Sequence, residues 1–187
     1  MAHYDETFSN VKFVTEQVKG VEFDGCRFKS CSFESCRLDQ SNFVDCHFSD
    51  CNFAMAQTNE TGLKEVRFEN CKLVGLDFSS CTDFLFRVEF VNCQLDFALF
   101  TKKNLRQTPF RNCSIREADF SGTNLTAATF AGCDLAGAQF ESCIFEKTDF
   151  RSAQNFTIDP NRNRMKGARF SRFSLAGLLQ NYGLTIE

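Results

Sequence analysis

Large apolar side chains recur at every fifth position along most of this chain. A five-residue period fits neither the roughly 3.6-residue turn of a helix nor the alternation of a strand. It predicts a backbone that turns one corner per repeat and points one large side chain inward each time. The first series is Phe8, Phe13, Val18, Phe23, Phe28, Phe33, Leu38, Phe43, Phe48 and Phe53. Thr58 interrupts it, and the same frame then continues with Leu63, Phe68, Leu73 and Phe78. After a shift of two residues near 79–84, the series runs from Leu85 to Phe150.

Residues 20 positions apart are of the same type, which predicts four sides per coil. Coils spaced like the strands of a sheet, about 4.8 Å apart, would stack these side chains along one axis. About seven to eight such coils would form an all-β rod roughly 35 Å long. The predicted ring stacks are Phe8, Phe28, Phe48 and Phe68; Phe90, Phe110, Phe130 and Phe150; and Phe100, Phe120 and Phe140.

The position two residues before each large side chain is restricted to small residues, and all eleven cysteines occupy it. A metal site or a redox switch is one interpretation. However, no Cys-x-x-Cys occurs, and cysteines five apart fall on different sides of the coil. Cysteines one coil apart would have parallel Cβ vectors, which disfavours disulfides. We therefore interpret them as small buried filler and expect no metal and no cofactor.

The pattern small-polar-Leu/Phe-polar-polar resembles that of the pentapeptide-repeat proteins. It is seen in residues 118–122 (ADFSG) and 123–127 (TNLTA). The resemblance covers roughly residues 6–155. It implies that family's right-handed quadrilateral β-helix, which has the four-sided coil that the 20-residue period requires.

Composition and charge narrow the functional classes. The 24 phenylalanines and the absence of tryptophan indicate one hydrophobic slot filled repeatedly. A formal net charge of −3 is too balanced for a nucleic-acid binder, so no direct nucleic-acid partner is expected. His3 and His47 are the only histidines, and there is no glycine-rich phosphate loop. We therefore predict that the protein is not an enzyme.

Targeting signals are also missing from the sequence. The N-terminal stretch MAHYDETFSN lacks the apolar core of a secretory signal. No apolar run approaches the roughly 20 residues needed to cross a bilayer. So many cysteines suit a reducing compartment. We expect a cytoplasmic protein with no membrane partner.

Three segments depart from the repeat. In residues 55–62 a locally loosened coil is favoured over a functional site. In residues 79–84, two extra residues predict a structural bulge or kink that divides two lobes of a β-helix spanning residues 1–156. In residues 101–109, a distorted coil and a contact surface are equally favoured. The candidate partner-binding residues there are Lys102, Lys103, Asn104, Arg106 and Gln107.

Residues 157–187 follow the repeat as a C-terminal cap and dimerisation segment. We expect Ser174 to cap a short α-helix that Gly183 ends. A monomeric cap and a dimer seam would each cover the open end of the solenoid. The predicted interface residues are Leu175, Leu178, Leu179, Tyr182, Leu184 and Ile186.

Residues 167–186 are similar to the C-terminal ends of the quinolone-resistance (Qnr) and topoisomerase-poison immunity branch of that family. This resemblance implies an end-to-end homodimer that mimics DNA and binds a type II topoisomerase, DNA gyrase or topoisomerase IV. It also implies a projecting loop near residues 101–109, whereas the branch's shorter loop has no counterpart between Phe48 and Phe53. Regulation of the enzyme, or protection from quinolone-like poisons, is the expected function. The alternative is a generic structural or adaptor protein with an unrelated partner.

Overall fold

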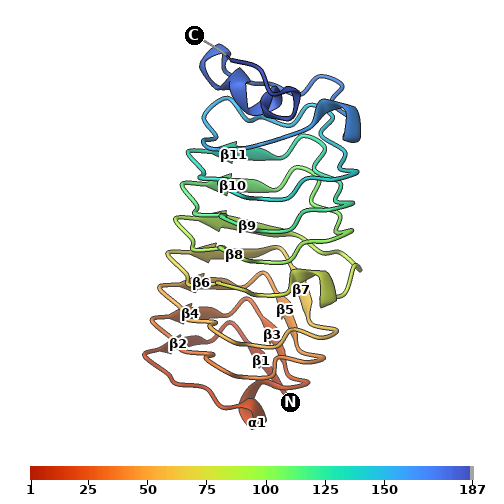
Figure 1. Cartoon of the computed structure of the whole chain (residues 1–187). Helices are drawn as coiled ribbons and strands as arrows, with labels where there is room; N and C mark the ends of the chain where they lie inside the picture. The colour runs from red at the N-terminus through yellow and green to blue at the C-terminus, as the bar shows by residue number, and fades with distance from the viewer. Residues whose placement is uncertain (186–187) are drawn as a thin grey trace.

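Each five-residue repeat contributes one side of a four-sided coil, because its single inward side chain is followed by a corner. The computed structural model describes residues 1–185 and shows these coils stacked into a rod, with the N- and C-terminal segments at opposite ends (Figure 1). We name the sides A, B, C and D after the columns of large residues that begin at Phe8, Phe13, Val18 and Phe23 respectively.

Parallel strands on two of these sides form continuous sheets. On side A the strands are β2 (Thr7–Ser9), β4 (Arg27–Lys29), β6 (His47–Ser49), β8 (Val66–Glu69), β9 (Val88–Val91), β10 (Pro109–Arg111) and β11 (Thr129–Ala131). On side D they are β1 (Ala2–Tyr4), β3 (Glu22–Asp24), β5 (Asn42–Val44) and β7 (Gly62–Lys64). Sides B and C are held by isolated parallel bridges between successive coils.

The helical segments lie near the ends of the rod and at one corner. They are α1 (Thr15–Val18) and the 3-10 turns η1 (Phe78–Ser80), η2 (Pro160–Arg162), η3 (Arg172–Leu178) and η4 (Gln180–Tyr182). The seven strands of side A mark about six turns, and isolated bridges carry the same ladder on to Arg169. The coil count is therefore close to the predicted seven to eight.

Phenylalanine rings fill the core in the columns that the 20-residue period predicts. Phe28 and Phe48 stack with centroids 4.6 Å apart and planes 10° from parallel. The stack on side A continues across the frame shift, where Phe68 and Phe90 lie 5.5 Å apart. The two predicted stacks that begin at Phe8 and Phe90 are therefore one column, and the core is continuous. Rings on adjacent sides meet edge to face, an arrangement that aromatic quadrupoles favour.

Donors at the small position bind backbone carbonyls of the preceding coil. The Thr123 hydroxyl donates to the Phe100 carbonyl oxygen at 2.8 Å, and the Cys143 thiol donates to that of Phe120 at 3.0 Å. A buried carbonyl without a partner would cost free energy, so a thiol or hydroxyl here does more than fill space. Thr58, at a large inward position, is also buried, and its hydroxyl donates to the Asp77 carbonyl oxygen of the following coil at 2.5 Å. The coil at residues 55–62 is therefore not loosened.

The frame shift pushes residues 83–86 outward from side D. The flanking N–H groups of Thr82 and Arg87 donate to the carbonyls of Thr61 and Leu63, at 3.0 and 2.9 Å. Between them the chain leaves the ladder, and the strands of side D end at β7. We had expected the core series to resume at Leu85, but this side chain is 65% exposed. The two extra residues cannot enter a core whose register is set by the neighbouring coils.

Lys103 anchors the outward segment 83–86 from one coil further on. It occupies a small inward position and is buried, with its Nζ 2.7 Å from Asp83 Oδ1. The ammonium also donates to the Cys81 carbonyl oxygen and lies 4.8 Å from the centre of the Phe86 ring. A buried charge is tolerated only with such partners. The lysine therefore replaces the usual small donor and spans the space that the extra residues open.

We expect Phe120→Ala to lower the free energy of unfolding by about 3–5 kcal/mol, because it leaves a cavity in the middle of a ring stack. Chemical denaturation measures this change. Phe97→Ala is the matched control: Phe97 lies at a corner and is 58% exposed, so its removal should cost about 0.5 kcal/mol or less. Equal midpoints for Phe120→Ala and the wild type would contradict this description of the core.

We expect Lys103→Met to release the outward segment, because Asp83 and the Cys81 carbonyl oxygen lose their shared donor. Chymotrypsin should then cut at Phe84 severalfold faster than in the wild type, and stability should fall by about 1–3 kcal/mol. Lys102→Met removes a neighbouring exposed lysine and should change neither quantity. Unchanged cleavage in Lys103→Met would show that the contacts of Lys103 do not hold the segment.

Candidate partner-binding surface

The segment 101–109 does not project from the rod. The N–H groups of Lys102 and Gln107 donate to the carbonyls of Ser121 and Thr126, at 2.8 and 2.9 Å, as regular corners do. Lys102 is exposed at the corner between sides C and D, and Arg106 is exposed beside the next corner. The basic residues are therefore not one cluster, because the chain crosses side D between them.

Lys103 must be removed from the candidate contact residues. Its side chain is 2% exposed and its ammonium is already bound within the protein. The sequence contained the signal, since this lysine occupies a position that is inward in every other repeat. Lys102, Asn104, Arg106 and Gln107 are exposed and remain candidates.

The outward segment 83–86 is the most evident surface departure from the repeat, and the sequence interpretation treated it as purely structural. Phe84 and Leu85 are 71% and 65% exposed. The Lys64 ammonium lies 5.3 Å from the centre of the Phe84 ring, a cation–π contact from the preceding coil. The two-residue frame shift was the signal for this projection, because residues without a place in the ladder must leave it.

Charge is unevenly distributed along side D. Toward the N-terminal end, Glu22, Asp24 and Asp45 form no ion pair within residues 1–185. Further along the rod the outward segment follows, and beyond it the exposed cations Lys102 and Arg106. Along the rod axis, side D therefore carries first an acidic end, then an apolar projection and then a basic stretch.

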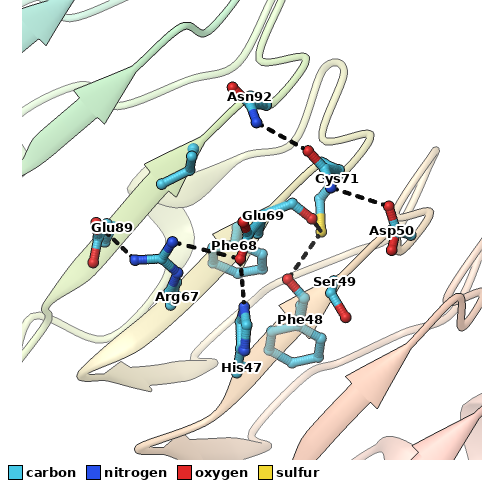
Figure 2. Close-up of polar contacts among 12 residues, drawn as sticks. His47, Phe48, Ser49, Asp50, Arg67, Phe68, Glu69, Cys71, Glu89 and Asn92 are labelled. Carbon is cyan, nitrogen blue, oxygen red and sulfur yellow. Dashed lines mark hydrogen bonds and ion pairs between the residues drawn. The ribbon is translucent and has the colours of Figure 1, made fainter.

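Side A differs, because its carboxylates are neutralised across coils (Figure 2). Glu69 lies 3.2 Å from His47 Nε2 and 3.4 Å from Arg67, and Glu89 lies 3.1 Å from Arg67. Arg111 of β10 completes the row at 2.5 Å from Glu89. Each exposed pair contributes about 1 kcal/mol or less to stability. Their main effect is that side A lacks a row of free negative charge over these strands.

Cys46 and Cys143 illustrate how burial makes a thiol a poor nucleophile. Burial raises the pKa of the Cys46 thiol to about 12 and that of Cys143 to about 11. These thiols stay protonated near neutral pH, whereas nucleophilic attack and metal binding both need the thiolate. No group of His, Cys, Asp or Glu side chains in residues 1–185 is arranged to hold a metal ion. Nor does that part of the chain contain a helix long and apolar enough to cross a membrane.

The C-terminal segment closes the core and exposes a second apolar surface. Phe170 stacks on Phe150 with centroids 5.2 Å apart, and Ile158 N–H donates to the Gly177 carbonyl oxygen at 2.9 Å. A Cβ on Gly177 would lie 2.3 Å from the Phe156 carbonyl oxygen, so only glycine fits at this close approach. The segment thus packs directly on the last coil.

The helical part of this segment differs from the prediction. It consists of the 3-10 turns η3 and η4 instead of an α-helix, and Ser171 caps it instead of Ser174. Gly183 ends it in the left-handed conformation, as predicted. The close packing of Gly177 on Phe156 confines the chain to short turns.

The predicted interface residues divide into three groups. Leu178 is half-buried against the core. Ile186 lies outside the described residues. The exposed apolar residues of this end are Leu175, Leu179, Tyr182 and Leu184, together with Phe173, which is 84% exposed and which the sequence interpretation missed.

Comparison with solved structures finds other pentapeptide-repeat proteins. A trypsin-treated variant of QnrB1, a plasmid-mediated fluoroquinolone resistance protein, aligns over 100% of both chains with 18% identity and a TM-score of 0.48. HetL, involved in heterocyst differentiation regulation in the cyanobacterium Nostoc sp. strain PCC 7120, has 15% identity and a TM-score of 0.40. That alignment covers 90% of this chain and 86% of HetL. A search of curated proteins finds no significant sequence match.

Two sequence families that are defined by this repeat match the chain directly. The family described as "Pentapeptide repeat region" matches residues 61–140, and the one described as "Pentapeptide repeats (9 copies)" matches residues 17–57. Because the sequence identities to the solved structures are low, the family assignment rests on these sequence matches and on the repeat itself. Because the matches together cover more than half of the chain, and the structure has the four-sided coil, the protein belongs to the pentapeptide-repeat family.

Proposed function

We propose that this protein is a non-enzymatic rod that binds a type II topoisomerase, DNA gyrase or topoisomerase IV. In this proposal it regulates the enzyme or protects it from quinolone-like poisons. The proposal combines the C-terminal resemblance of residues 167–186 to the Qnr branch with one structural observation. Side D carries unpaired carboxylates, an apolar projection and exposed cations along one face, whereas Glu69 and Glu89 of side A are paired with cations.

The acidic end of side D supports partial mimicry of DNA. Glu22 and Asp24 lie on β3 and Asp45 follows the neighbouring strand β5, so these carboxylates form a short row over two coils about 4.8 Å apart. A surface that binds duplex DNA attracts such a row electrostatically, and the attraction weakens with salt. The basic stretch with Lys102, Asn104, Arg106 and Gln107 then contacts a different part of the partner. The mimicry of DNA is therefore limited to the acidic end of side D.

The C-terminal end supports a homodimer. Phe173, Leu175, Leu179, Tyr182 and Leu184 expose apolar surface together at the end of the rod. Contiguous apolar patches on soluble proteins commonly mark interfaces. A two-fold contact through this end would bury the patch and give a rod roughly 70 Å long at about 4.8 Å per coil.

We expect light scattering at micromolar concentration to give about twice the 21.3 kDa chain mass. The double variant Leu175→Glu/Leu179→Glu should give the monomer mass, because each buried carboxylate would lack a partner. Val14→Glu alters an exposed apolar residue at the opposite end and should leave the dimer intact. A monomeric wild type would leave the C-terminal segment as a cap only.

We expect the wild-type protein to change DNA supercoiling by gyrase, or to reduce fluoroquinolone-stabilised cleavage. Lys102→Ala combined with Arg106→Ala should weaken the effect about fivefold to tenfold, because both cations lie on side D. Arg116→Ala is the matched control, since Arg116 is an exposed cation on side B and pairs with Asp134 at 2.6 Å.

Two outcomes would redirect this proposal. No effect of the wild type at any tested excess would exclude the topoisomerase, and a protein recovered reproducibly from a cytoplasmic pull-down would then identify an adaptor's partner. A wild-type effect that survives the double substitution would keep the function and exclude the basic stretch as the contact.

A further inference from the structure

Two hollows lie next to each other where side D meets side A, beside the outward segment. One is a groove of about 200 Å³ and the other a hollow of about 390 Å³. Both are lined by Arg87 and Glu65, whose ion pair of 3.2 Å forms the ridge between them. The two hollows form at this level of the rod axis because the frame shift places Leu85, Phe86 and Arg87 outside the regular coil.

The groove is cationic. Its carboxylates are already paired: Glu65 with Arg87, and Glu89 with Arg67 at 3.1 Å and with Arg111. Arg106 also lines the groove, and among the described residues it makes only a backbone hydrogen bond, to Asn104 Oδ1. An arginine free of carboxylates beside a groove is suited to bidentate binding of an incoming carboxylate.

The neighbouring hollow is mainly apolar. Val44, Leu85 and Phe86 line it, together with the aliphatic part of Lys64. Asp45 also lines it, so a peptide carboxylate is favoured on the Arg106 side and not in this hollow. Phe86 is fixed from behind, because it packs against the core and the buried Lys103 ammonium lies over its ring. The hollow is therefore a preformed site for one large apolar side chain.

We propose that this pair of hollows binds an acidic peptide segment of a protein partner, with a large apolar side chain in the hollow and a neighbouring carboxylate on Arg106. The apolar hollow argues against a nucleic-acid backbone, which has no large apolar side chain to fill it. Strand addition is excluded along side A, because β8, β9 and β10 are paired on both edges. The segment thus binds through its side chains. This inference holds whatever protein supplies the segment, so it does not depend on the topoisomerase.

The test is selection of peptides from a random phage-displayed library on the full-length protein, followed by fluorescence polarisation of the enriched peptide. We expect enrichment of Asp or Glu next to Leu, Ile or Phe. Arg106→Ala should weaken binding about fivefold and Arg106→Glu about tenfold or more. Leu85→Ser should weaken it about fivefold, through loss of the apolar contact.

Arg116→Ala is the matched control, since Arg116 is an exposed arginine on side B that lies outside both hollows. It should change affinity by less than about twofold. Arg106 and Leu85 are exposed, so their variants should fold, and circular dichroism checks this. A selection without binders, peptides without acidic enrichment, or equal losses in Arg116→Ala and Arg106→Ala would each overturn the proposal. None of these measurements contains a topoisomerase, so this inference and the proposed function fail separately.

Discussion

The register between successive coils is the constraint on which the rest of the structure depends. Backbone groups on each side pair with the coils before and after, as in the bridges from Asp77 to Leu99 and from Leu99 to Asp119. Because this pairing repeats, the ring stacks, the inward hydrogen-bond donors and the corners each recur at the same position in successive coils. A coil can therefore gain residues only by pushing them outward. The same constraint that makes the core uniform thus produces the one irregular surface on side D.

Much of the fold could be predicted because the repeat contributes one inward residue at a time. The identity of Phe110 or Phe130 alone says little, but their spacing places both in one column. The helical end could not be predicted in the same way. An apolar pattern at i, i+3, i+4 and i+7 is compatible with several turns, and the close packing of Gly177 against Phe156 decides between them. That contact joins segments that no periodic pattern relates.

The candidate site was less predictable because its chemistry depends on pairs from different coils. Lys103 was interpreted by its charge, whereas its inward position and its distance to Asp83 decide its role. Net charge likewise cannot distinguish Glu89, which two arginines neutralise, from Asp45, which has no ionic partner within residues 1–185. The two hollows also could not be inferred, because they arise where a local insertion meets side chains of adjacent coils.

The inward donors give the rod a direction. Most thiols and hydroxyls at small positions donate to a carbonyl of the coil before them, as Cys143 does to Phe120. A newly made coil therefore has these carbonyls open until the next one is added, and Asn163 closes the last such site at the Phe140 carbonyl oxygen. On a ribosome, the order of synthesis is also the order in which the coils are completed. The inward hydrogen bonds of most coils can therefore be completed only after the following coil has been made.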